Sequence, residues 1–267
     1  MGIVSDAFDL SGKVAIVTGG ARGIGKAAAQ AMGDVGAHVV LADLLDDAMT
    51  ETASELKSNG MSVETARLDV SDSKAVDALV NATVAKHGRL DVMVNNAAII
   101  TESTPLNVTE EELDKVHRVN FKGVVFGSQA AARVMIPQGA GSIINIASGA
   151  IDGPTPMMIA YATAKAAASH FSRSLALEIG KHGVRVNVVA PGWTDTPMNE
   201  RHVLRPDGSI DEEKKAAYVA MRAASAALGK PGEAMDQAMA ILYLASNAAK
   251  FVTGQVIRPN GGTSMLW

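Results

Sequence analysis

Cysteine is absent from this chain of 267 residues, so the sequence offers neither a disulfide nor a thiolate ligand for zinc. The six histidines are scattered, and no two of them form an H-x-x-x-H pair, which argues against a metal site. No run of about 18 apolar residues is present to cross a membrane. The opening stretch, MGIVSDAFDLSGK, lacks the basic and apolar regions of a signal peptide. We therefore expect no metal, no membrane partner and, by default, a cytoplasmic location.

An excess of positive charge is missing as well. The formal net charge is −4 and no basic stripe is present, so nucleic acid is not an expected partner. Charged residues make up 19% of the chain and hydrophobic residues 48%, which is ample material for a core. The length favours one large domain or two small ones.

Short apolar runs alternate with helical patterns from one end of the chain to the other. The runs are rich in Val and Ile, and their continuous apolarity indicates strands buried on both faces, as in a parallel sheet. The predicted strands are 13–18, 38–43, 63–69, 90–95, 142–147, 185–190 and 254–258. The predicted helices are 24–35, 46–59, 72–87, 109–136, 157–182, 211–228 and 231–247. This alternation predicts an α/β fold: a single doubly wound, Rossmann-type domain over 1–267, with about seven parallel strands and helices on both faces.

Two local features add detail to this prediction. Thr109 and Glu112 have the spacing of a capping box, which would open the helix over 109–136. Residues 195–210 are polar and contain two prolines, and we expect 195–228 to form a lid that closes over a substrate.

The stretch TGGARGIGKA, residues 18–27, fits two phosphate-binding patterns. From Gly20 it is one residue short of a P-loop, G-x-x-x-x-G-K-[ST], but the position that needs a Mg²⁺-binding hydroxyl is Ala27. From Thr18 it is a glycine-rich turn between a strand and a helix, where the pyrophosphate of a dinucleotide binds. Asp43 ends the next strand, near the expected place of the acid that holds the adenosine ribose hydroxyls. Asp43 could instead cap the following helix, but the upstream glycine turn favours the dinucleotide interpretation.

With these motifs the sequence resembles the short-chain dehydrogenase/reductase family, in its shorter, common branch, over nearly the whole chain. The family pattern T-G-x-x-x-G-x-G is met by Thr18, Gly19, Gly23 and Gly25. The further matching elements are Asp69-Val70, Asn95-Asn96-Ala97-Ala98, Pro191-Gly192, Thr196, 251–256 and Gly261-Gly262. Ala98 stands where the family has Gly, which predicts a local backbone adjustment. The longer epimerase/dehydratase branch would need Gly where this chain has Arg22.

Tyr161 is the one tyrosine of three with a lysine four residues later, Lys165, so the two side chains share a helix face. An isolated Y-x-x-x-K is more often a surface tyrosine beside a solvated lysine. Here Ser148 follows a predicted strand and Asn120 lies in the preceding long helix, and both match the family's catalytic set. A tyrosine that acts as a base near neutrality needs a pKa roughly two to three units below its usual value of about 10. A nearby ammonium favours phenolate, whereas burial opposes it.

The resemblance implies the following roles. Tyr161 is the general acid/base, Lys165 also grips the nicotinamide ribose, Ser148 hydrogen-bonds the substrate oxygen, and Asn120 positions a water that passes the proton on. The cofactor-binding residues that we expect are Gly19, Arg22, Gly23, Ile24, Gly25, Asp43, Asp69, Val70, Asn96, Tyr161, Lys165, Thr194 and Thr196.

The choice between the two nicotinamide cofactors depends on Asp43. Its carboxylate lies where the 2′-phosphate of NADP would go, and the neighbouring Leu44 offers no cation, so NAD(H) is favoured. Arg22 inside the glycine turn argues the other way and keeps an NADPH-dependent ketoacyl-type reductase as the alternative. A non-catalytic NAD-binding sensor or scaffold is a further alternative, although all four catalytic positions are filled.

The expected substrate is a moderately hydrophobic secondary alcohol or its ketone. Apolar side chains flank the catalytic segments, and no cluster of Arg or Lys lies near Tyr161 in the sequence. Family members usually form homotetramers through the two long helices, here 109–136 and 157–182. The small apolar stripe on the second of these helices fits close helix packing: Ala162, Ala166, Ala167 and Phe171.

Overall fold

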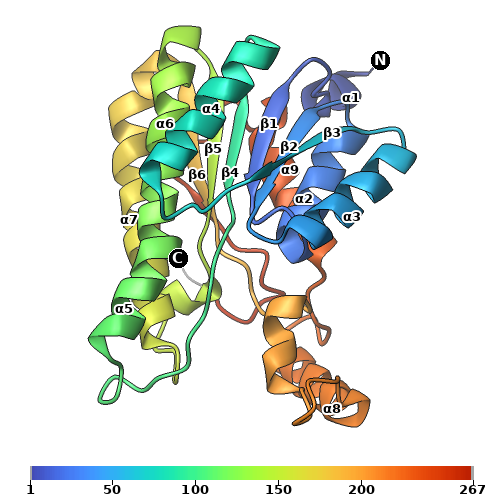
Figure 1. The fold of residues 1–267 in the computed structure, drawn as a ribbon, viewed down its shortest axis with the longest axis vertical. Helices are drawn as coiled ribbons and strands as arrows, with labels where there is room; N and C mark the ends of the chain where they lie inside the picture. The colour runs from blue at the N-terminus through green and yellow to red at the C-terminus, as the bar shows by residue number, and fades with distance from the viewer. Residues whose placement is uncertain (1, 266–267) are drawn as a thin grey trace.

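The computed structural model describes residues 2–265 and contains one seven-stranded parallel sheet, which confirms the predicted α/β class (Figure 1). The strands are β1 (Val14–Thr18), β2 (His38–Asp43), β3 (Ser62–Arg67), β4 (Val92–Asn95), β5 (Gly141–Ile146), β6 (Val184–Val189) and β7 (Val256–Ile257). Their order is β3-β2-β1-β4-β5-β6-β7, so the direction of winding reverses between β1 and β4. Ligands of such sheets bind at this reversal, beyond the carboxyl ends of the strands.

Helices cover both faces of the sheet. The α-helices are α1 (Ile3–Phe8), α2 (Gly23–Asp34), α3 (Asp46–Ser58), α4 (Ser73–His87), α5 (Glu110–His117), α6 (Gly123–Gln138), α7 (Ile159–Ile179), α8 (Glu212–Ala224) and α9 (Ala234–Ala245). One core packs α2, α3 and α9 against the sheet, and a second packs α4, α6 and α7 against the opposite face (Figure 1). The inner strands β1, β2, β4, β5 and β6 are almost entirely buried, which explains their continuous apolarity, whereas the edge strands β3 and β7 are partly exposed. Within residues 2–265 no helix has both the length and the apolar character to cross a bilayer.

The helix expected over 109–136 is interrupted. It begins with the predicted capping box, in which Thr109 and Glu112 each bond the other's backbone N–H, and α5 ends at His117. A π-helical turn, η1 (Arg118–Lys122), then separates α5 from α6. Polarity alone does not reveal a π-turn, because its residues keep a helical pattern.

In the described part of the chain, four short 3₁₀-helices connect the main elements: η2 (Gly149–Ile151), η3 (Gly180–His182), η4 (Pro197–His202) and η5 (Asn247–Ala249).

Residues after β6 form an excursion from the sheet, which includes η4. Helix α8 follows η4 and contributes no buried residue, and Figure 1 shows it projecting from one end of the molecule. The expected helix over 211–228 is thus present but shorter.

Candidate active site

The glycine turn after β1 is built for close backbone approach. Gly19 has a φ of +63°, and a Cβ there would lie 2.8 Å from the Cα of Ala97. A Cβ on Gly25 would lie 2.1 Å from the Gly19 carbonyl oxygen, so neither position has room for a side chain. Gly23 begins α2, and Ile24 follows in its first turn. The N-cap residue Arg22 makes no side-chain capping bond, so within the part of the chain that the structure describes the first N–H groups of α2 have no capping side chain and can bind an anion.

Asn96 supports this turn from behind. Its Nδ2 donates to the carbonyls of Thr18 and Gly19, each at 3.0 Å, and its own N–H donates to the Thr18 hydroxyl at 3.0 Å. The side chain is therefore committed to holding the end of β1 against the end of β4. The geometry assigns Asn96 a scaffolding function, and its direct contact with a cofactor stays a prediction.

Asp43 lies at the carboxyl end of β2, beside the glycine turn. Its Oδ2 accepts from the N–H of Ala21 at 3.0 Å, and its Oδ1 accepts from the N–H groups of Leu44 and Leu45 at 2.8 and 3.2 Å. Both interpretations of Asp43 are thus compatible with the structure: it binds the backbone near the start of α3 and also faces the turn. Each carboxylate oxygen has about two acceptor sites, so Oδ2 keeps capacity for a ribose hydroxyl.

Asp69 and Val70 follow β3 and differ in exposure. The Asp69 carboxylate is exposed and accepts from the N–H of Ser71 at 2.8 Å. Val70 is buried and lies against Gly123, where a Cβ would approach it to 2.9 Å. Val70 therefore joins the end of β3 to the start of α6.

Tyr161 and Lys165 lie one turn apart in α7 and both are buried, with 9% and 1% exposure. The Lys165 Nζ donates to the Ile146 carbonyl at 2.6 Å and lies 5.7 Å from the centre of the Tyr161 ring. Burial lowers the pKa of Lys165 from 10.5 to about 8. Burial raises the pKa of Tyr161, against the opposing effects of a hydrogen bond with Ser148 and the charge of Arg201. In the protein alone, desolvation therefore outweighs the charges that favour phenolate.

Ser148 and Asn120 approach the same region from different elements. Ser148 lies just beyond β5, and its Oγ accepts from the N–H of Ala150 at 3.2 Å, which fixes the start of η2. Asn120 is fully buried in the π-turn η1. Its side chain bonds the main chain of Ile99 in both directions, at 2.9 and 2.8 Å. Because Ile99 lies in the loop after β4, Asn120 holds that loop at the carboxyl edge of the sheet.

Thr194 and Thr196 follow β6, and Thr196 lies beside the glycine turn. Thr194 is buried, and its hydroxyl donates to the Gly192 carbonyl at 3.1 Å. The Thr196 side chain lies beside Gly23, where a Cβ would approach it to 3.6 Å. The structure thus brings the segment after β6 against the start of α2, although 173 positions separate Gly23 from Thr196.

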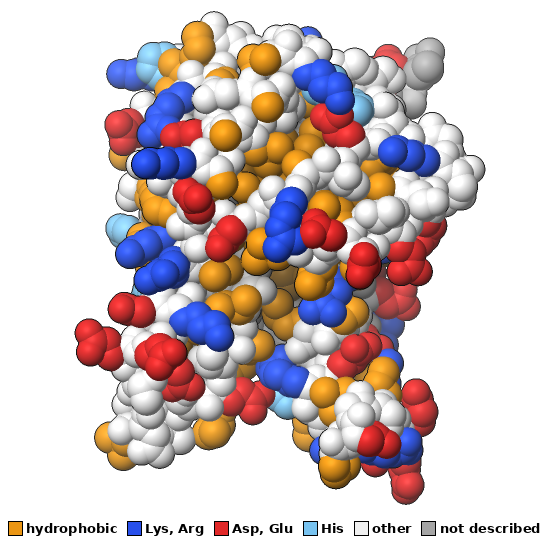
Figure 2. Space-filling view, in the orientation of Figure 1, with side chains coloured by type: hydrophobic (Ala, Val, Ile, Leu, Met, Phe, Trp, Pro, Cys, Tyr) orange, Lys and Arg blue, Asp and Glu red, His pale blue; other side chains and the backbone are white. Residues whose placement is uncertain are grey.

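Three further residues lie near the site, and of these only Met157 was noted in the sequence, as one of the apolar residues that flank the catalytic segments. Arg201 in η4 donates from Nε to Glu102 Oε1 at 2.9 Å and acts on the Tyr161 pKa. Glu102 belongs to the loop before α5, so this ion pair joins two separate lobes, and Figure 2 shows a notch between the α5 lobe and the α8 lobe. Met157 precedes α7 with a φ of +62°, a strained conformation for a side chain of this size. None of the three follows a motif.

The profile of the short chain dehydrogenase family matches residues 13–206. The chain belongs to this short-chain dehydrogenase family. It is similar to the short chain dehydrogenase/reductase astE of Aspergillus oryzae, with 39% identity over 97% of both chains. It is also similar to the 3-oxoacyl-[acyl-carrier-protein] reductase FabG of Thermotoga maritima, with 36% identity over 95% of this chain and 98% of the relative. Among solved structures, the gluconate 5-dehydrogenase of Burkholderia cenocepacia in complex with NADP and tartrate has a TM-score of 0.88 and 30% identity, covering 97% of this chain and 98% of the other.

This short-chain dehydrogenase is therefore an oxidoreductase of a family that binds a nicotinamide cofactor. The residues present fit such a group, since there is no room for a side chain at Gly19 or Gly25 and no described side chain caps the start of α2.

Proposed function

We propose that this short-chain dehydrogenase transfers a hydride between NAD(H) and a moderately hydrophobic secondary alcohol or ketone, with Tyr161 as general acid/base. The observation that carries the proposal is the buried Tyr161–Lys165 pair beside Ser148, at the same edge of the sheet as the glycine turn. A nicotinamide ring, when bound, accepts or donates the hydride, and the chain's own residues manage the proton.

In the oxidation direction, Tyr161 accepts the hydroxyl proton of the alcohol as the C–H bond breaks. Ser148 holds the substrate oxygen by a hydrogen bond. Lys165 adds positive charge close to the phenol, with its Nζ 5.7 Å from the ring centre. In the protein alone, desolvation of Tyr161 outweighs the opposing effects of Ser148 and Arg201, so the pKa of Tyr161 is raised. Asn120 keeps the loop that contains Ile99 in place, and its amide retains hydrogen-bonding capacity for a water on the proton path.

The preference for NAD(H) rests on Asp43. A carboxylate at the ribose position repels a 2′-phosphate, and Leu44 beside it is 47% exposed and uncharged. Arg22 is exposed at the glycine turn, and relatives include 3-oxoacyl-[acyl-carrier-protein] reductases, so the competing proposal is an NADPH-dependent ketoacyl-type reductase. The two differ in their ratio of catalytic efficiencies with NAD(H) and NADP(H).

Residues 195–228 act as the lid in this proposal. Apart from Val203, which is 2% exposed, the segment has few core contacts. Trp193 and Tyr218 meet edge to face with ring centres 5.7 Å apart, which ties α8 to the segment after β6. The Arg201–Glu102 ion pair offsets the charge of Arg201, which lowers the pKa of Tyr161, in keeping with a substrate of low charge.

A homotetramer, located in the cytoplasm, completes the proposal. The stripe Ala162, Ala166, Ala167 and Phe171 lies on the outer side of α7, with each residue exposed or partly exposed and outside the buried clusters. Light scattering at micromolar concentration tests the assembly, and a monomer there would contradict it.

The decisive experiment is a panel of secondary alcohols and ketones assayed with both cofactors, on the wild type and Tyr161→Phe. We expect NAD-linked turnover in the wild type and near-total loss in Tyr161→Phe with cofactor binding retained. A clear preference for NADP(H) with ketoacyl substrates would favour the competing enzyme. Tight NADH binding with no turnover on any substrate would favour a sensor or scaffold.

A further inference from the structure

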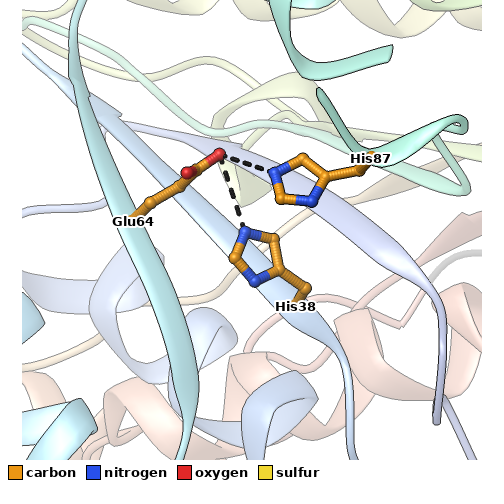
Figure 3. A group of neighbouring side chains, drawn as sticks. All are labelled: His38, Glu64 and His87. Carbon is orange, nitrogen blue, oxygen red and sulfur yellow. Dashed lines mark hydrogen bonds and ion pairs between the residues drawn. The ribbon is translucent and has the colours of Figure 1, made fainter. Parts of the chain in front are cut away.

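A second cluster of functional side chains lies at the opposite end of the sheet from the active site. His38 is the first residue of β2, Glu64 is the third of β3, and His87 ends α4. The register pairs His38 with Ser62 and Val40 with Glu64, so His38 and Glu64 project from the same face, on which α4 packs. Figure 3 shows both imidazole rings directed at the Glu64 carboxylate.

The distances within this cluster approach those of a metal site. His87 Nε2 lies 2.9 Å and His38 Nε2 lies 3.6 Å from Glu64 Oε1. One ligand atom from each residue lies within 4.8 Å of the others. Tetrahedral zinc, with bonds of about 2.0–2.1 Å, holds its ligand atoms roughly 3.4 Å apart. Small side-chain rotations would therefore suffice to bring the three atoms onto one ion.

One atom of the cluster is left without a hydrogen bond. His38 Nδ1 lies 2.7 Å from the Ser62 hydroxyl, while His38 Nε2 is buried and has no hydrogen-bond partner among the described residues. If Nδ1–H donates to Ser62, the lone pair of Nε2 points toward an anionic oxygen. In that tautomer two acceptors face each other, and a shared cation would satisfy both. In the other tautomer Nε2–H faces Glu64 Oε1 at 3.6 Å, which is too far for a hydrogen bond. Ser62 has the position of an outer residue that orients a metal-binding histidine.

We propose that His38, Glu64 and His87 form a zinc site, with water as the fourth ligand. Two imidazoles and one carboxylate are a ligand set that zinc prefers and that magnesium does not. The three side chains are 21%, 24% and 19% exposed, which leaves an approach for the ion and for a water. The ion would join β2, β3 and the end of α4, so its effect is on stability and not on the distant hydride transfer. No metal was expected from the sequence, because that expectation took account only of ligands that lie close together along the chain.

Lys86 competes with a cation for this site. Its Nζ pairs with Glu64 Oε2, and its side chain is 64% exposed, so it can move into solvent when an ion binds. Replacing Lys86 should therefore tighten metal binding, an effect that misfolding cannot imitate.

The test is calorimetric titration of the untagged, EDTA-treated protein with ZnCl₂, in excess MgCl₂. We expect one zinc ion per chain, a higher melting temperature with zinc, and a tetrahedral visible spectrum with Co²⁺. His38→Gln and His87→Gln should weaken zinc binding by more than the roughly 10–100-fold that loss of an outer-shell partner such as Ser62 costs. Lys86→Met should bind more tightly, and the exposed His182→Gln should match the wild type.

Melting curves in EDTA check that each variant is folded, and the isosteric Glu64→Gln serves if a histidine variant is not. The proposal is overturned if the wild type fails to bind zinc under these conditions. It is also overturned if folded His38→Gln and His87→Gln bind as tightly as the wild type, or if Lys86→Met leaves the affinity unchanged.

Discussion

The ammonium nitrogen of Lys165 lies 5.7 Å from the centre of the Tyr161 ring, in a site from which solvent is almost excluded. Its hydrogen bond goes to the carbonyl of Ile146 and not to the phenol. The end of β5 thus holds the lysine in place. A neutral carbonyl does not offset the free-energy cost of burying the ammonium charge, and the pKa of Lys165 is lowered as a result.

Lys165→Met should change how stability depends on pH. The pKa of Lys165 is about 8 in the folded protein and near 10.5 when exposed, so the wild type bears a cost of roughly 3 kcal/mol below pH 8. Between about pH 8 and 10.5 the unfolded chain binds a proton that the folded chain does not, so wild-type stability rises with pH. Lys165→Met lacks this gain.

We therefore expect the wild type to gain in melting temperature relative to Lys165→Met as the pH is raised from 8 to 10, without cofactor. The loss of the bond to Ile146 is independent of pH and shifts the whole curve. A difference in melting temperature that stays constant over this range would contradict the buried-charge interpretation.

Asp43→Ser should weaken the use of NAD, and adding Leu44→Arg should favour NADP. Losing a hydrogen bond from a charged acceptor costs about 1.5–3 kcal/mol, which corresponds to a decrease of roughly 10–100-fold in kcat/KM with NAD. Asp43→Asn is the matched control, because it keeps an acceptor for the backbone N–H groups while removing the charge. If the ratio of the two efficiencies is the same in all variants, Asp43 does not select the cofactor.

Glu102→Gln and Arg201→Met should shift the pH profile of alcohol oxidation in opposite directions. Arg201 lowers the pKa of Tyr161, and Glu102 offsets that charge. Removing the Glu102 carboxylate should lower the pKa of Tyr161 further, so alcohol oxidation begins at lower pH. Removing the Arg201 guanidinium should raise that pKa, so oxidation begins at higher pH. The profile of kcat/KM against pH measures both; shifts of the same sign would mean that the lid, and not the charge, is responsible.

Asp91→Asn should destabilise the amino-terminal edge of the sheet. Asp91 accepts from the Val14 N–H at 3.0 Å and from two nitrogens of Arg89, both at 2.6 Å. Burial raises its pKa, but Arg89, the Val14 N–H and Lys13 together bring that pKa below its usual value. We expect a loss of about 2 kcal/mol in the free energy of unfolding by urea at pH 7.

The surface pair Asp77–Arg133 supplies the control for Asp91. Its atoms are 2.7 Å apart but both side chains are well exposed, so Asp77→Asn should cost less than about 1 kcal/mol. Because the folded pKa of Asp91 is lowered, its contribution is present above the unfolded pKa near 3.8 and is lost as the pH falls below it. Equal losses for the two variants would contradict this ranking.

Much of the fold was predictable because buried parallel strands carry a local signature. The seven apolar runs are the seven strands, and the capping box at Thr109 opens α5 as expected. The π-turn was not predictable, since Asn120 takes its place through a bond to Ile99 that depends on tertiary packing. Helix α1 was also missed, and it contributes no buried residue that would give it a pattern.

The candidate site likewise contains features that the sequence predicts and features that it does not. Motifs with fixed spacing identified the glycine turn and the Tyr161–Lys165 pair, because neighbours in sequence share a turn or a helix face. The ion pair of Arg201 with Glu102 spans 99 positions. The cluster around Glu64 forms only because β2 pairs with β3 and because α4 packs on the sheet with His87 at its end. Such pairs have no local pattern, so a single sequence does not reveal them.

Helix α8 contributes no buried residue and contacts the segment after β6 through Tyr218, so the core of the fold places few constraints on the rest of its composition. Natural variation or laboratory recombination can therefore exchange this segment between relatives at little thermodynamic cost, while the layers around the sheet stay intact. With residues 195–228 as the proposed lid, selectivity and robustness would be encoded in separable parts of the polypeptide, and the segment around α8 would be the natural place to diversify the enzyme.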